Sequence, residues 1–143
     1  MNLEPQSWTW TRECTFPSDM DTAHSLINEV MAVMRTKLWN AKDLFALELT
    51  LEEALANAVK HGNGSDPTKQ VRFDCKSNQN MVYVRVEDEG SGFDPRRLAD
   101  PREPENQMIE SGRGVLLVTH FTTRAQWNER GNVVEFVKER SAQ

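Results

Sequence analysis

The sequence has little of what membrane and nucleic-acid-binding proteins require. No apolar run approaches the about 20 residues that cross a bilayer, and the segment from Met1 to Trp8 has neither a basic start nor the apolar stretch of a secretory signal. The formal net charge is −5 and the pI is near 5.2, so there is no surplus of Lys and Arg for a phosphate backbone. We therefore expect a cytoplasmic protein with neither a nucleic acid nor a membrane as partner.

Cysteine and histidine are also scarce. Cys14 and Cys75 stand far apart without metal or redox spacing, and the three histidines are equally scattered: His24, His61 and His120. This scatter argues against a metal centre built from these residue types. It favours two buried free thiols, with a single disulfide as the alternative.

The length and the hydrophobic pattern indicate the fold class. With 143 residues, 38% of them apolar, the chain can bury a core, and we expect one domain over residues 1–143. Alternation predicts strands over residues 8–16, 71–75, 82–86, 122–127 and 133–138, with hairpin turns at 76–80 and 128–132. Helical periodicity predicts helices over residues 20–39, after a break and cap at 17–19, over residues 43–60, and around 115–118. This order predicts an α+β fold, a two-layer α/β sandwich with helices on one face of a mixed, mostly antiparallel sheet.

The second predicted helix, which we expect Asp43 to cap, carries two faces. At about 100° per residue its leucines form one apolar stripe, which is the expected core contact: Leu44, Leu47, Leu51 and Leu55. By the same arithmetic Glu53, Asn57 and Lys60 share another face. A solvated polar face would explain this trio, but the glycine-rich segment that follows directly lets a ligand approach.

Six of the seven glycines fall into three Gly-x-Gly pairs, at residues 62–64, 90–92 and 112–114. Glycine is needed where the backbone adopts a positive φ or lies flat against a ligand. Ordinary turn chemistry explains any one pair taken alone. The order of the pairs and their neighbours indicate more, because a Glu-x-x-x-Asn helix precedes the first, Asp88 opens the second, and the third opens a helix. Together these features predict an ATP site.

Three segments resemble the N, G1 and G2 boxes of the GHKL ATPases: residues 53–62, 88–93 and 111–115. The short chain and the Glu-Ala-x-x-Asn-Ala-x-x-His-Gly form of the first segment are similar to the anti-sigma-factor serine/threonine kinases of bacterial partner-switching systems. The resemblance implies the Bergerat ATP-binding fold, with ATP and Mg²⁺ as cofactors. It also implies an anti-sigma-factor antagonist as the protein substrate, a sigma factor as a second partner, and a homodimer.

The resemblance assigns roles at the adenine and metal ends of the site. Asp88 would accept a hydrogen bond from the exocyclic amine of adenine, where guanine presents a carbonyl. Gly90 and Gly92 would let the backbone run close to the base and the ribose. Asn57 would bind Mg²⁺, which commonly takes one or two protein oxygens together with phosphates and water.

The G2 box would hold the phosphates. Gly112, Arg113, Gly114 and Val115 open the third predicted helix, so that backbone N–H groups and the helix dipole would meet the phosphates. Lys60 and Arg113 could add positive charge.

Glu53 would be the general base that takes the proton from an attacking hydroxyl, one helical turn before the metal ligand. Between the last two boxes, a proline-rich and charged segment at about 94–111 resembles the ATP lid of the superfamily.

The chain departs from the family pattern at two positions. Glu110 stands where an Arg often precedes the Ser of the G2 box, and Asn132 follows Gly131 where a Thr is common. Two alternatives to a kinase remain: a GHKL module that regulates a partner by binding alone, and a detached catalytic domain of a histidine kinase.

Overall fold

The computed structural model describes residues 1, 3, 7–90 and 110–142, with the backbone alone for residues 110–114. Its helices and strands follow the predicted order. In chain order they are β1 (Trp10–Pro17), α1 (Met20–Arg35), α2 (Ala41–Ala56), the π-helical segment η1 (Asn57–Gly62), β2 (Gln70–Ser77), β3 (Met81–Glu87), α3 (Glu110–Phe121), β4 (Arg124–Trp127) and β5 (Val133–Glu139).

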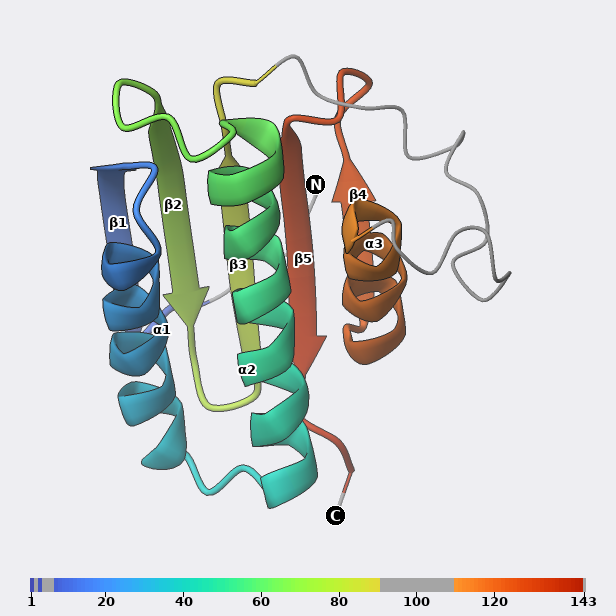
Figure 1. Cartoon of the computed structure of the whole chain (residues 1–143). Coiled ribbons are helices and arrows are strands. Elements are labelled where there is room, and N and C mark those ends of the chain that lie inside the picture. The colour runs from blue at the N-terminus through green and yellow to red at the C-terminus, as the bar shows by residue number, and fades with distance from the viewer. Residues whose placement is uncertain (2, 4–6, 91–109, 143) are drawn as a thin grey trace.

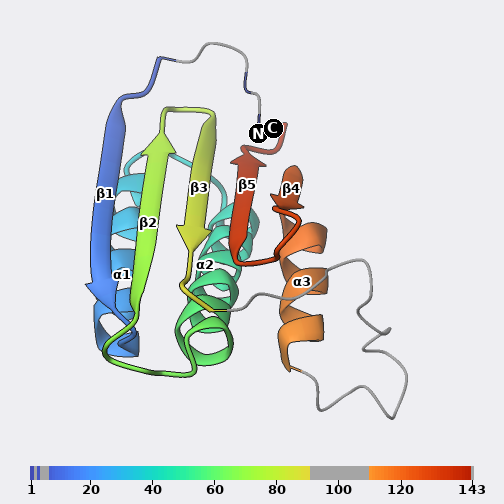
Figure 2. The same cartoon turned by 90° about the horizontal axis from the view of Figure 1, so that it is seen from above.

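The strands form one sheet in the order β1-β2-β3-β5-β4. All pairings between neighbouring strands of the described chain are antiparallel, so the sheet is not mixed. The three α-helices lie on one face of this sheet, with α1 beside β1 and β2, α2 over the centre, and α3 at the β4 edge (Figure 1, Figure 2). The predicted two-layer α+β sandwich is confirmed.

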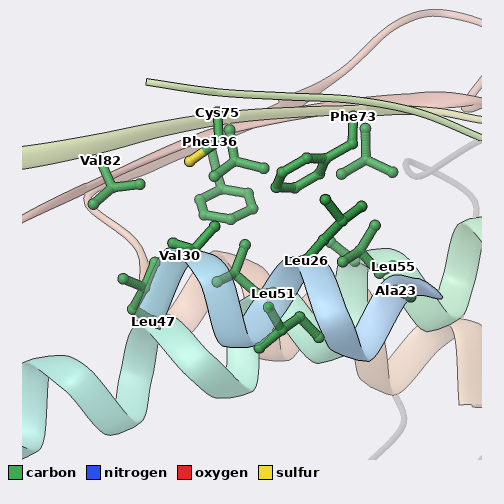
Figure 3. Close-up of a cluster of buried hydrophobic side chains, with 14 of the residues drawn as sticks. Ala23, Leu26, Val30, Leu47, Leu51, Leu55, Phe73, Cys75, Val82 and Phe136 are labelled. Atoms are coloured by element: carbon green, nitrogen blue, oxygen red, sulfur yellow. The ribbon is translucent and has the colours of Figure 1, made fainter. Parts of the chain in front are cut away.

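The core lies between the two layers. Apolar side chains from α1 and α2 point toward those of the central strands (Figure 3). Fully or almost fully buried members are Leu26, Val30, Leu47, Leu51, Leu55, Phe73, Cys75, Val82 and Phe136. Three of the four leucines in the predicted stripe of α2 are therefore fully buried, while Leu44 is half-buried at its edge.

The predicted cap of the first helix is confirmed, but that of the second helix is wrong. Asp19 caps α1, and its Oδ1 accepts the N–H of Asp21 at 3.0 Å. The cap of α2 is Asn40, whose Oδ1 accepts the N–H of Asp43 at 2.7 Å. Asn and Asp cap helices about equally well, so residue type alone does not distinguish Asn40 from Asp43.

Asp43 instead holds the C-terminal segment. Its carboxylate accepts the N–H of Ser141 at 2.8 Å and the hydroxyl of Ser141 at 2.6 Å. The ammonium of Lys138 lies 3.2 Å away. Burial alone would raise the pKa of Asp43, but these contacts outweigh it and hold the pKa below the ordinary value.

Both α1 and α2 end earlier than the pattern predicts. The first ends at Arg35 because Leu38 has a φ of 61°, which a right-handed helix does not allow. Trp39 is buried outside the helix, where its Nε1 donates to the carbonyl of Gln79 at 2.9 Å. After Ala56 the second helix widens into η1, and Asn63 N–H bonds the carbonyl of Ala58, five residues back, at 2.9 Å. Such π-helical segments often occur at functional sites.

Both cysteines are free, as expected. Cys14 is half-buried, whereas Cys75 is buried in the core, and this burial raises the pKa of its thiol to about 12. The thiol of Cys75 is therefore protonated and unreactive near neutral pH.

Among the helices of the described chain, none combines the length and the apolarity that crossing a bilayer requires.

Candidate functional site

A cavity of about 160 Å³ lies where the end of α2, η1, the end of β3, the start of β5 and α3 meet. Its walls are mostly apolar, with a few polar groups. The lining residues are Ala54, Asn57, Ala58, His61, Gly62, Val86, Asp88, Val118, Trp127, Gly131, Asn132, Val133 and Val134. An apolar cavity with few polar groups suits a flat heteroaromatic ring, because the polar groups then fix its orientation.

Asp88 is the acidic residue of this cavity and is only 9% exposed. Its Oδ1 accepts the N–H of Gly90 at 2.8 Å. Burial raises the pKa of this carboxyl above its ordinary value, although the Gly90 bond and the charge of Arg130 oppose the rise. A desolvated carboxylate gains more from a hydrogen-bond donor than one in water does. Asp88 therefore adds a desolvated hydrogen-bond acceptor to the residues that line the cavity.

The carboxylate is enclosed by two glycines that contact each other. A Cβ atom on Gly62 would come within 2.2 Å of Asp88 Oδ2, and one on Gly90 would come within 1.9 Å of the Gly62 carbonyl oxygen. Gly90 was expected to let the backbone approach a ligand. That contact stays a prediction, and the structure adds a packing role, because the missing side chain of Gly90 lets the turn after β3 lie against η1. Gly92 lies outside the described residues.

Asn63, between the first two glycines, is a structural residue and is 2% exposed. Its Nδ2 donates to Ser18 Oγ and to the carbonyl of Gln70, both at 2.9 Å. Its Oδ1 accepts the N–H of Glu89 at 2.8 Å. This side chain therefore ties η1 to the starts of α1 and β2 and to the turn after β3, which fixes the cavity wall.

A second cavity, of about 280 Å³, adjoins the first along α2 and η1. Its lining residues are Glu52, Glu53, Ala56, Asn57, Lys60, His61 and Leu117. Glu53, Asn57 and Lys60 thus share one face, as predicted, although the helix between them is partly π-helical. Asn57 and His61 line both cavities, so they stand at the junction between them.

The third glycine pair opens a helix, as predicted. Gly112, Arg113 and Gly114 lie in the first two turns of α3. Val115 is half-buried, while Leu117 and Val118 are the α3 residues that line the cavities.

Most of the predicted lid at about 94–111 lies outside the described residues, which do not include residues 91–109. The last two positions of that range, Glu110 and Ser111, belong to α3.

Three polar or aromatic residues that line the first cavity were not predicted as site residues: His61, Trp127 and Asn132. His61 follows Asn57 by four residues, a spacing that places two side chains on the same side of a helix, and this signal was available. Trp127 and Asn132 come from the β4–β5 hairpin, and only the tertiary fold brings them to α2. Asn132 had been noted as a departure from the family pattern.

Within the described part of the chain, no group of three or more His, Cys, Asp or Glu side chains could hold a metal ion. A Mg²⁺ ion in a nucleotide site commonly takes one or two protein oxygens and fills its other positions with phosphate oxygens and water. The half-buried amide of Asn57, at the junction of the cavities, fits such a ligand.

Comparison with known proteins agrees with this geometry. The family model of the histidine kinase-like ATPase domain matches residues 16–138. The serine/threonine-protein kinase BtrW of Bordetella bronchiseptica is 25% identical over 96 residues, which cover 64% of this chain and 66% of that protein. Anti-sigma F factors of Oceanobacillus iheyensis and a Geobacillus species are 24% and 25% identical over 83 residues, covering 55% of this chain. The matched part spans about 56% of the length of each of these two relatives.

Among solved structures, the RsbU and RsbW domains of Rv1364c from Mycobacterium tuberculosis superpose with a TM-score of 0.53 at 16% identity. The superposition covers 94% of this chain and 34% of that one. This similarity supports the fold.

Proposed function

Since this chain belongs to the histidine kinase-like ATPase domain family, we propose that it is an ATP-dependent protein kinase acting on a serine or threonine of an anti-sigma-factor antagonist. In this proposal the chain works as one cytoplasmic domain, forms a homodimer, and also binds and inhibits a sigma factor. The relatives named as a serine/threonine kinase and as anti-sigma factors support this choice.

The adenine base is assigned to the cavity at Asp88. A buried carboxylate in mostly apolar walls accepts a hydrogen bond from the exocyclic amine of adenine and disfavours guanine, which presents a carbonyl at that position. The ribose and phosphates would then extend past Asn57 toward the second cavity, because Asn57 lines both.

The observation that carries the kinase proposal is the grouping of Glu53, Asn57 and Lys60 around the second cavity. Asn57 would hold Mg²⁺ against the phosphates, and Lys60, together with Arg113, would offset their negative charge. Gly112, Gly114 and Val115, near the N-terminus of α3, would offer backbone N–H groups and the helix dipole to the phosphates. Gly92 is retained as a proposed ribose contact.

Glu53 is the proposed general base. It is half-buried and precedes Asn57 by one helical turn. ATP supplies the phosphoryl group: the hydroxyl oxygen of the antagonist forms a bond to the γ-phosphorus, the bond to the β,γ-bridging oxygen breaks, and ADP leaves. The Glu53 carboxylate takes the hydroxyl proton. Most of the rate enhancement would come from positioning and charge neutralisation rather than from this proton transfer.

The experiment compares transfer of radiolabelled γ-phosphate by the wild-type protein and by Glu53→Gln, with an antagonist-like protein as acceptor. We expect Glu53→Gln to keep ATP affinity within a few-fold and to reduce transfer by about 10²–10⁴, the range for general acid–base catalysis. Glu48→Gln is the matched control on the same helix. Its only ion pair in the described chain, with Arg35 at 3.7 Å, is exposed, and such pairs contribute little.

The product distinguishes the alternatives. Phosphoserine or phosphothreonine supports the kinase proposal. Tight ATP binding without labelling of any antagonist would favour a module that acts by binding alone, and phosphohistidine would favour a histidine kinase catalytic domain.

A further inference from the structure

The turn of the β4–β5 hairpin, residues 128–132, packs against the turn that carries Asp88. The backbone N–H of Asp88 donates to the carbonyl of Asn132 at 2.9 Å. In return, the side-chain Nδ2 of Asn132 donates to the carbonyl of Asp88 at 3.0 Å. Asn132 is 8% exposed and Asp88 is 9% exposed, so water competes little for these bonds. Both backbone polar groups of Asp88 are thus held by one residue that lies 44 positions away.

Arg130 makes the second contact between the hairpin and this turn. Its Nη2 donates to the carbonyl of Gly90 at 2.7 Å. The N–H of Gly90 in turn donates to Oδ1 of Asp88 at 2.8 Å. Replacing Arg130 can therefore alter the position of the Asp88 carboxylate through Gly90. The planar guanidinium of an arginine is well suited to a directed hydrogen bond of this kind.

The hairpin is itself held in shape by Asn128. Its Oδ1 accepts the N–H groups of Gly131 at 2.8 Å and Val133 at 3.1 Å, and its Nδ2 donates to Asn132 Oδ1 at 2.7 Å. Gly131 has a φ of 80°, which favours glycine. Because Asn128 and Asp88 bind the two ends of the Asn132 amide, its orientation is fixed.

We propose that Arg130 and Asn132 are positioning residues, which hold the Asp88 carboxylate in the geometry that selects adenine over guanine. The inference rests on the proposed ATP binding. Asn132 lines the cavity, but its amide oxygen and nitrogen both contact protein groups. It therefore acts on a bound base through Asp88, and the hairpin sets the purine selectivity of the site.

The effect of the Arg130 charge on the pKa of Asp88 supports the same positioning role. Burial and Glu87 raise the pKa of Asp88, while the Gly90 hydrogen bond, Arg130 and Lys69 lower it. His61 is a further titratable group that lines the cavity. Removing Arg130 should therefore let Asp88 take up a proton at a higher pH, and the ionised acceptor would be lost earlier as the pH falls.

The first test is calorimetric titration of wild-type protein and Asn132→Ala with Mg-ATP and with Mg-GTP. We expect Asn132→Ala to weaken ATP binding by about tenfold, the scale of one buried hydrogen bond. GTP binding should change less, so the preference for ATP should fall. Asn28→Ala, on the exposed face of α1, is the control and should bind both nucleotides as the wild type does. Thermal unfolding of each variant checks that it is folded.

The second test uses Arg130, which is exposed and whose replacement does not open a cavity in the core. ATP affinity is measured from pH 4 to pH 8 for wild type, Arg130→Ala, Arg130→Lys and Arg124→Ala. Arg124 is an exposed residue of β4 that controls for the loss of one positive charge. Because nucleotide protonation is the same in all four titrations, differences between the curves come from the protein. We expect the fall of ATP affinity at low pH to begin at a higher pH in Arg130→Ala only. Arg130→Lys should lose affinity over the same pH range as the wild type, but its affinity should stay below that of the wild type.

An unchanged preference for ATP over GTP in Asn132→Ala would overturn the inference. So would an Arg130→Ala protein whose ATP affinity falls over the same acid pH range as that of the wild type. If Asp88→Asn still abolished ATP binding, the proposed ATP site would stand although the positioning role of Arg130 and Asn132 had failed. Failure of the wild-type protein to bind ATP would instead reject the proposed function. If Asn132→Ala does not fold, the Arg130 series decides the question.

Discussion

Replacement of Gly62 by alanine tests whether the Asp88 carboxylate is placed by a close contact with η1. A Cβ atom at this position would lie 2.2 Å from Asp88 Oδ2 and 2.6 Å from Oδ1. A close carbon–oxygen contact is about 3.3 Å, so the carboxylate must move by about 1 Å. Gly62 has no positive φ, so the backbone itself accepts alanine without strain.

The two effects of this substitution have opposite signs. Helix propensity alone would stabilise alanine over glycine by about 0.5–1 kcal/mol, whereas overpacking costs about 1–3 kcal/mol. With an unfolding entropy of about 2.1 cal/mol/K per residue, 143 residues give about 0.3 kcal/mol/K. A net cost of about 1–2 kcal/mol would thus lower Tm by about 3–7 °C. Loss of a charged hydrogen bond, about 1.5–3 kcal/mol, would weaken ATP binding by about tenfold to 150-fold.

Thermal unfolding and calorimetric titration with Mg-ATP measure both quantities. Gly64→Ala is the matched control, because Gly64 has a φ of +59° and open space around it. It should lose about 1–2 kcal/mol through backbone strain and keep the wild-type affinity for ATP. A Gly62→Ala protein that melts at a higher temperature and binds ATP normally would refute the reasoning.

Three further substitutions have defined outcomes. Asp88→Asn should abolish Mg-ATP binding in calorimetry, because the amide can present a donor to the adenine amine, yet leave Tm equal or higher, since burial makes the charged form costly. Asn57→Ala should weaken Mg-ATP binding more than metal-free ATP binding, and equal losses would indicate a structural role. Asp43→Asn should lower stability to urea at pH 7. Because the pKa of Asp43 in the folded protein lies below its ordinary value, the difference from wild type should shrink as the pH falls below that ordinary value.

The sequence predicted well those features that depend on neighbouring residues. Alternation located all five strands, and the leucine stripe of α2 identified its buried face. Glu53, Asn57 and Lys60 lie on the continuous helical segment formed by α2 and η1, so their shared face followed from spacing alone. The cap of α2 was misplaced because Asn40 and Asp43 both suit that position chemically.

What could not be predicted depends on contacts between distant segments. The contact of Gly62 with Asp88 and Gly90, and the pairing of Asn132 with Asp88, exist only once η1, β3 and the β4–β5 hairpin are brought together. Periodicity carries no information on these contacts. The widening of α2 into η1 is likewise invisible to a rule of about 100° per residue.

The most direct test of the ATP-site assignment is a crystal structure of the protein with Mg²⁺ and a non-hydrolysable ATP analogue. The account predicts the adenine ring in the cavity between α2 and β5, its exocyclic amine within hydrogen-bonding distance of an Asp88 carboxylate oxygen, and the metal ion at the Asn57 side chain. An adenine ring bound elsewhere, or one whose amine does not contact Asp88, would contradict it.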